Sequence, residues 1–306
     1  MIRNEKKEKM ITFALSFLGI LAGTLIPVYV ALLLIPAIGE RVPVRYISAF
    51  GLGIVFFFYV DVMFDSTELG VNSGFSGGLY QLGLVASFIA GLIVLTGFDH
   101  YAFPKIFENN GGNNLSISSS VSRLAFLVPV GVALGLGVHG VGEGASFAFI
   151  AATSSSQSLL GTYGGYGPAI SYVLHKFLEG SVVASAYCVY VVGRESVTTR
   201  KLGFNIANKE IIWQIVLLGL LMGGPSLIGA TAGYYYNIDP LFFYAFAGGA
   251  AVYAILRLTE PLFHPQWGSK DYVPTSLNSA ISIILLVGFI CLYIAALFHS
   301  TILLGS

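Results

Sequence analysis

Eight long apolar stretches divide this chain, and they constrain its fold more than any other feature. A helix needs roughly 20 consecutive apolar residues to cross the hydrocarbon core of a bilayer. The composition agrees, because 56% of the 306 residues are hydrophobic and only 10% are charged. We therefore predict an all-α integral membrane protein in which residues 1–306 form a single transmembrane domain. The expected helices cover residues 11–35, 46–63, 78–98, 124–152, 167–192, 211–236, 240–257 and 274–298.

The charges between these stretches predict an orientation. With eight spans the loops alternate between the two sides, and 4 of the 15 Lys and Arg lie in the N-terminal segment, whose side otherwise carries none. Ten lie on the opposite side, and Lys176 falls inside a span. Cytoplasmic loops carry the excess of Lys and Arg, so we expect both termini outside, in a plasma or inner membrane. The first apolar stretch is longer than the roughly 7 to 15 residues of a signal peptide, which predicts a retained helix.

Two copies of one pattern place ionisable residues near the middle of the fourth and fifth stretches. The pattern H-x-x-x-E-G occurs at His139 and Glu143 and again at His175 and Glu179. Residues four apart share a helix face, and ionisable side chains at bilayer depth are costly enough to indicate function. If the two helices are neighbours, the nitrogens and oxygens converge. They would then suit a borderline divalent cation such as Zn²⁺, Fe²⁺, Mn²⁺ or Cd²⁺.

Two other functions use the same residue types and stay open at this point. One is an intramembrane zinc-dependent hydrolase, although the chain has no H-E-x-x-H and no Ser or Asp placed with the paired motifs as an obvious nucleophile or base. The other is a proton-coupled carrier of an organic solute, which could use His and Glu pairs without a metal. We expect a transporter rather than an enzyme. We also expect the metal as its substrate, no cofactor, contact with the lipid bilayer and no nucleic acid partner.

The chain also resembles the ZIP (Zrt/Irt-like) family of divalent metal transporters. Its two patterns are similar to the H-x-x-P-E-G patterns of that family's fourth and fifth helices, here without the proline. The stretch AFAGGAAVYAILRLTEP resembles the family's seventh helix, GFDHYAFP the exit of its third, and MGGPSLIGATAGYY its sixth. The resemblance implies an eight-helix bundle in an inverted 3+2+3 arrangement. It also implies movement of divalent metal ions, Zn²⁺ first among them, toward the cytoplasm by alternating access, and family members can form homodimers.

The resemblance assigns roles to the paired residues. Glu143 and Glu179 fall on the core ligands of the family's primary metal site. His139 completes the set of ligands, and His175 falls on a position that varies within the family. The implied site therefore lies between the fourth and fifth helices.

A second metal ion is not expected. Family members with two ions have an Asn, an Asp and often a Glu where this chain has Gly140, Lys176 and Gly224. We interpret the Lys176 ammonium as a substitute for the second cation, holding Glu143 and Glu179 ionised and oriented. The alternatives are that Lys176 simply pairs with Glu179 three residues on, or that it snorkels away from the bundle.

Acidic residues at the outer end of the second helix form a candidate entrance. Asp61, Asp65 and Glu68 could draw cations inward, although an ordinary solvated helix end has the same composition. Asp239 before Pro240 is predicted to cap the seventh helix.

Overall fold

The computed structural model describes residues 2–39, 41–72, 78–108, 117–153, 163, 165–192, 208–236, 238–263 and 279–300. These residues form helices and connections, with no strand in the described ranges. The helices are α1 (Ile2–Gly39), α2 (Val44–Asn72), α3 (Gly78–Glu108), α4 (Ile117–Thr153), α5 (Tyr166–Tyr187) with its π-helical continuation η2 (Cys188–Val192), α7 (Lys209–Tyr235), α8 (Leu241–Phe263) and α9 (Ser279–Ser300).

Each of the eight predicted stretches overlaps one of these helices, which confirms the all-α prediction for the described part of the chain. Several helices run further than the apolar stretch, as α1 and α2 do. The reason is that hydropathy marks only the part in the hydrocarbon, while a helix continues into the polar headgroup region. Seven of the described helices are long and apolar enough to cross a membrane, and α5 is not among them. The chain is thus a multi-pass helical membrane protein.

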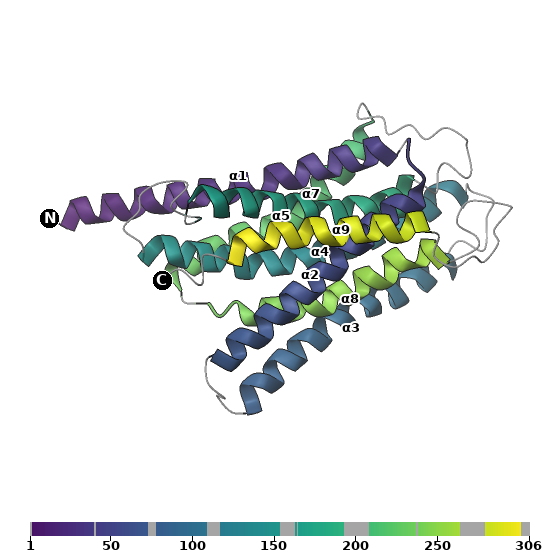
Figure 1. Ribbon diagram of the computed structural model, residues 1–306. Coiled ribbons are helices and arrows are strands. Elements are labelled where there is room, and N and C mark those ends of the chain that lie inside the picture. Colours follow the sequence, from purple (N-terminus) through teal and green to yellow (C-terminus); the bar gives the residue numbers. More distant parts are fainter. Residues whose placement is uncertain are drawn as a thin grey trace.

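The more polar α5 lies at the centre of the bundle (Figure 1). It packs against α1, α2, α4 and α9, and every residue from 178 to 191 is buried. By contrast, α3 and α9 turn large apolar side chains outward, among them Leu79, Leu82 and Ile283. Lipid tails solvate such side chains well, whereas polar groups must face protein or a water-filled space. Position in the bundle therefore explains why α5 can carry ionisable residues.

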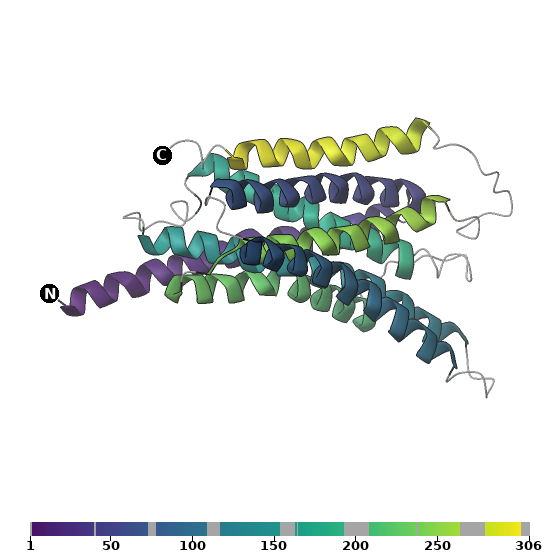
Figure 2. The ribbon, with the colours of Figure 1, turned by 90° about the horizontal axis from the view of Figure 1, so that it is seen from below.

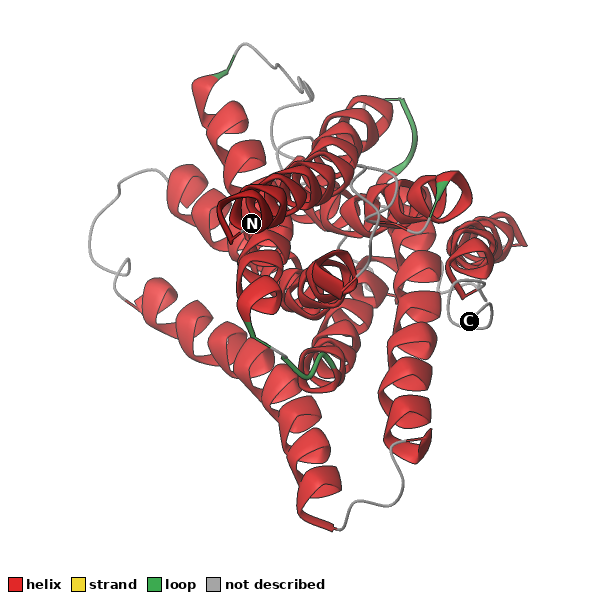
Figure 3. Cartoon of the chain, turned by 90° about the vertical axis from the view of Figure 1, so that its left-hand side faces the viewer, coloured by secondary structure: helices red, strands yellow, loops and turns green. Residues whose placement is uncertain are grey.

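The first and last helices meet the same end of the bundle. The start of α1 and the end of α9 lie on one side in both Figure 1 and the view from below in Figure 2. Figure 3 looks along the bundle from that end. An even number of crossings gives this result, as the predicted orientation requires. Which side faces the cytoplasm stays a prediction.

Glycines let the two central helices approach their neighbours closely. A Cβ on Gly144 of α4 would clash with the carbonyl oxygen of Ser226 on α7. A Cβ on Gly180 of α5 would come within 3.1 Å of Val28 and Ala31 on α1. Small residues at helix crossings are typical of membrane bundles, where packing drives association. Each of these glycines directly follows a Glu of the paired motifs, so the close packing fixes the backbone beside each carboxylate.

The predicted cap of the seventh spanning helix, α8, is confirmed. Asp239 Oδ1 accepts a hydrogen bond from the backbone N–H of Leu241 at 3.0 Å. Tyr80 of α3 donates its hydroxyl to Asp239 Oδ2 at 2.5 Å. The capping carboxylate thereby also joins the ends of α3 and α8.

Candidate metal centre

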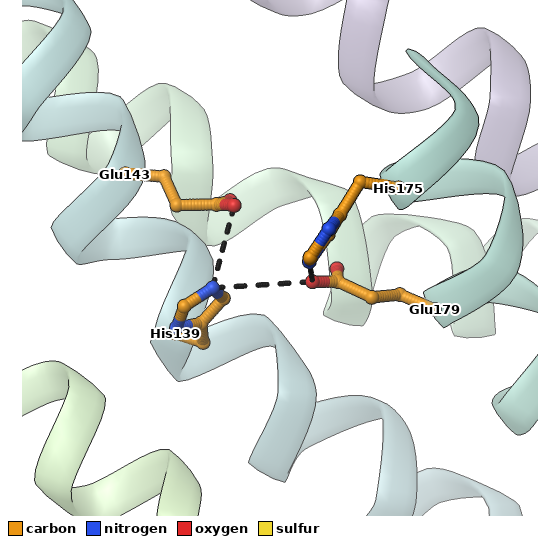
Figure 4. A group of neighbouring side chains, drawn as sticks. All are labelled: His139, Glu143, His175 and Glu179. Atoms are coloured by element: carbon orange, nitrogen blue, oxygen red, sulfur yellow. Dashed lines mark ion pairs between the residues drawn. The ribbon is translucent and has the colours of Figure 1, made fainter. Parts of the chain in front are cut away.

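The paired motifs face each other across the α4–α5 contact. His139 and Glu143 lie on one face of α4, and His175 and Glu179 lie on one face of α5. All four side chains are buried. Figure 4 shows the two pairs pointing into the space between their helices. The structure thus brings together the four residues that the spacing of the motifs predicted.

The polar atoms of these side chains are close enough to hold one ion. One ligand atom from each residue can be chosen so that all four lie within 4.8 Å of one another. His139 Nε2 lies 3.3 Å from Glu143 Oε1, and His175 Nε2 lies 3.0 Å from Glu179 Oε1. Across the two helices, His139 Nε2 lies 3.9 Å from Glu179 Oε1. A tetrahedral zinc site with bonds near 2.0–2.1 Å needs ligand atoms about 3.3 Å apart, so the widest separations in this group exceed that spacing by up to about 1.5 Å.

Lys176 is part of the same cluster. Its Nζ lies 2.7 Å from Glu179 Oε2 and also contacts Glu143 Oε2. Lys176 is 2% exposed, so the alternative in which it snorkels away from the bundle is wrong. Pairing with Glu179 is confirmed, and the contact with Glu143 extends it across the two helices. One ammonium therefore bridges the two carboxylates.

Two aromatic rings enclose His139, and neither was anticipated from the sequence. The ring of Phe58 on α2 packs edge-on at 5.1 Å between centroids, and that of Tyr244 on α8 lies at 4.8 Å. Hydropathy carries no signal for them, because it does not tell which helices of a bundle touch. Within the described residues, His139 Nδ1 has no hydrogen-bond partner. The imidazole is thus positioned by packing, with its Nε2 turned toward the carboxylates.

A second aromatic group lies one turn from the cluster, toward the connection between α4 and α5. Tyr172 places its ring 5.7 Å from Lys176 Nζ, and its hydroxyl lies 2.8 Å from Thr24 Oγ1 on α1. Phe147 packs on Tyr172 at 4.9 Å between centroids. Helical periodicity could have found both residues, because Tyr172 precedes Lys176 by four and Phe147 follows Glu143 by four.

Tyr163, in the connection between the two helices, completes this aromatic group. Its ring lies 5.2 Å from Tyr172 and 5.4 Å from Phe147, between centroids. Its hydroxyl donates to the carbonyl oxygen of Gly19 on α1 at 2.5 Å. Burial, followed by the nearby negative charge of Glu143, raises the pKa of Tyr163 above its ordinary value. The phenol therefore stays neutral and remains a hydrogen-bond donor.

The candidate entrance is described only in part. Asp61 lies on α2, one turn beyond Phe58, and is partly buried. The side chains of Asp65 and Glu68 lie outside the described part of the structure. An entrance role for these three residues stays a prediction.

Gly140 and Gly224, two of the positions that bear on a second metal site, lie in different surroundings, and the absence of a second ion stays a prediction. Gly140 packs against Ser226, and Gly224 meets open space. Among the described residues, His139, Glu143, His175 and Glu179 are the one group of His, Cys, Asp or Glu side chains that could hold a metal ion.

Fold and site together define a multi-pass helical membrane protein with a buried group of side chains able to hold a metal ion. No protein-family model matches the chain, and no curated protein matches it either. The resemblance to ZIP transporters therefore rests on the sequence motifs.

Proposed function

We propose that this protein carries divalent metal ions across the membrane, with His139, Glu143, His175 and Glu179 as the transport site. The observation that carries the proposal is the convergence of these four buried ligands from two helices in the interior of an apolar bundle. Burying ionisable groups there is costly. Binding of a cation as substrate accounts for that cost.

The composition of the site favours Zn²⁺ as the first substrate to test. Two imidazole nitrogens and two carboxylate oxygens are four ligands of the kinds that Zn²⁺ accepts in tetrahedral sites. Fe²⁺, Mn²⁺ and Cd²⁺ are further candidates, because affinity for one set of ligands overlaps among divalent metals. With neutral histidines and a charged Lys176, the empty cluster carries one net negative charge. This charge attracts a cation without holding it irreversibly.

The same geometry argues against the two other functions. A catalytic zinc keeps one coordination position open for water or substrate and usually has three protein ligands, whereas four protein side chains converge here. An organic solute needs a cavity of several hundred Å³, whereas the ligand atoms lie within 4.8 Å of one another. A single ion fits this space better than a solute or a catalytic water.

The helix packing supports the inverted arrangement that the family resemblance implies. We propose that α1, α2 and α3 are related to α7, α8 and α9, and that α4 is related to α5. This relation makes the contact of α1 with α5 equivalent to the contact of α7 with α4. Both contacts are close, and each lies beside a glycine that follows a Glu of the paired motifs. The pair α2 and α9 corresponds to the pair α8 and α3, and both pairs also pack closely. Transport toward the cytoplasm by alternating access is part of the same proposal.

Uptake into proteoliposomes tests the function. Zn²⁺, Fe²⁺, Mn²⁺ and Cd²⁺ would each be offered to the parent protein and to a double variant, Glu143→Gln with Glu179→Gln. We expect uptake of at least Zn²⁺ by the parent, and uptake at the level of protein-free liposomes in the variant, because both oxygen ligands lose their charge. Ser185→Ala is the matched control, since Ser185 is also buried on α5 and, among the described residues, its hydroxyl donates to the Ser181 carbonyl in its own helix. A folded parent that moves none of these ions would overturn the proposal.

A further inference from the structure

In each of the two carboxylates of the site, one oxygen faces a histidine and the other faces Lys176. The Oε1 atoms of Glu143 and Glu179 face the histidines, each within 3.3 Å of the Nε2 atom of the histidine on its own helix. The Oε2 atoms of both residues face the other way and meet the Nζ atom of Lys176. The ammonium therefore contacts the Oε2 atoms, and the Oε1 atoms face the histidines.

Lys176 is itself held in place by its surroundings. An ammonium has three N–H donors, and two carboxylates and the face of the Tyr172 ring surround this one. The Tyr172 hydroxyl is in turn fixed by Thr24 of α1 at 2.8 Å. Tyr172 is 1% exposed and Thr24 is 1% exposed, so packing leaves little freedom. Through this chain of contacts, α1 helps to fix the Oε2 atoms of Glu143 and Glu179.

The division of oxygens limits how the carboxylates can bind a metal. A carboxylate binds a cation through one oxygen or through both, and larger ions with more ligands use both. If the ammonium holds each Oε2, each Glu offers a single oxygen and the site supplies four ligand atoms. Four ligands in a tetrahedral arrangement suit Zn²⁺, whereas Mn²⁺ prefers six oxygen-rich ligands. Outer partners of metal ligands commonly tune metal affinity in this way.

We propose that Lys176 is a specificity-determining residue that keeps Glu143 and Glu179 monodentate and thereby favours Zn²⁺ over Mn²⁺. This inference rests on the proposed function, because it assumes that the four residues bind the transported ion. It goes beyond charge compensation. An ammonium acting only through its charge would weaken the binding of all divalent ions by the same factor, whereas a geometric restraint changes the ratio between them.

Co²⁺ is the probe for the geometry, because tetrahedral Co²⁺ absorbs visible light much more strongly than five- or six-coordinate Co²⁺. Purified parent protein and Lys176→Met would be titrated with Co²⁺, and then with Zn²⁺ and Mn²⁺ in competition. We expect intense tetrahedral bands in the parent and weaker bands in Lys176→Met, whose freed Oε2 atoms can also bind. The Zn²⁺-over-Mn²⁺ affinity ratio should fall by about tenfold or more in the variant, the size of effect known for outer partners of metal ligands.

Each result is decisive. An unchanged Co²⁺ spectrum together with an unchanged Zn²⁺-over-Mn²⁺ ratio would overturn the inference, even if both affinities change. Failure of the folded parent to bind any of these ions would instead overturn the proposed function, so the two failures are distinguishable. Should Lys176→Met not fold, Lys176→Gln serves the same purpose, because its amide can hold one Oε2 while the other is released. In Lys176→Gln the Zn²⁺-over-Mn²⁺ affinity ratio should fall by a smaller factor than in Lys176→Met.

Discussion

At the scale of single residues, the stability of the metal-free protein depends on which buried charge of the cluster a substitution removes. Lys176 contributes one positive charge and Glu143 and Glu179 two negative ones, all of them buried. Removing one partner of a buried ion pair strongly destabilises a protein, since the other charge is left uncompensated. Here, however, loss of one carboxylate leaves a balanced pair, whereas loss of the ammonium leaves two carboxylates facing each other.

We therefore expect Lys176→Met to lower the stability of the metal-free protein by about 3 kcal/mol, and Glu143→Gln to lower it much less. Thermal unfolding of the purified proteins in detergent, with a chelator present, measures the difference. Adding Zn²⁺ should raise the Tm of Lys176→Met more than that of the parent, because the ion supplies the missing positive charge. A larger loss in Glu143→Gln than in Lys176→Met would contradict this account of the cluster.

At the scale of helices, the H-x-x-x-E-G patterns predicted the ligands because their chemistry is local. Four residues make one helical turn, so spacing alone puts His139 beside Glu143 and His175 beside Glu179. The glycine after each Glu carried little weight in the sequence, because a lone Gly has many uses. Its role depends on a partner helix far away in the chain, α7 for Gly144 and α1 for Gly180. The rings of Phe58 and Tyr244 escaped prediction for the same reason.

Gly144→Ala tests whether this close packing positions the site. The new Cβ would clash with the Ser226 carbonyl oxygen, which is backbone and cannot turn aside, so α4 must shift away from α7. We expect a loss of stability of about 1–3 kcal/mol, as for other overpacked interiors. Zn²⁺ binding should also weaken, since Glu143 moves with the backbone. Unfolding and isothermal titration measure the two effects.

Gly97→Ala on α3 is the matched control for Gly144→Ala. A Cβ at Gly97 meets no other atom within 4 Å, so both properties should stay close to those of the parent. Gly144→Ala with parent-like stability and Zn²⁺ affinity would show that the contact between α4 and α7 has no part in holding the site.

At the scale of the whole molecule, the solvent on each side of a helix decides what its sequence looks like. The spans of α3 and α9 have few buried residues and turn apolar side chains outward, so hydropathy locates them easily. The second half of α5 is enclosed by other helices and can be polar. That α5 crosses the membrane is inferred from its motif and from its position between other helices, because its own apolarity is too low to indicate it. Hydropathy thus predicts where helices lie along the chain, but it does not say which helices surround the site.

The orientation of the bundle in the membrane follows from charge and is open to a direct test. The first connection, with Arg41, and the start of α2, with Arg45, belong to the side rich in Lys and Arg, and the connection after α7 belongs to the other side. Excess positive charge marks the cytoplasmic side. Single cysteines would be placed at two exposed positions, Arg41→Cys and Tyr236→Cys, after replacement of the free Cys188 and Cys291 by alanine. A membrane-impermeant maleimide applied to intact cells should label Tyr236→Cys and spare Arg41→Cys until the cells are opened. The reverse pattern would place both termini in the cytoplasm and would reverse the expected sides of the transport path, while leaving the metal site itself unaffected.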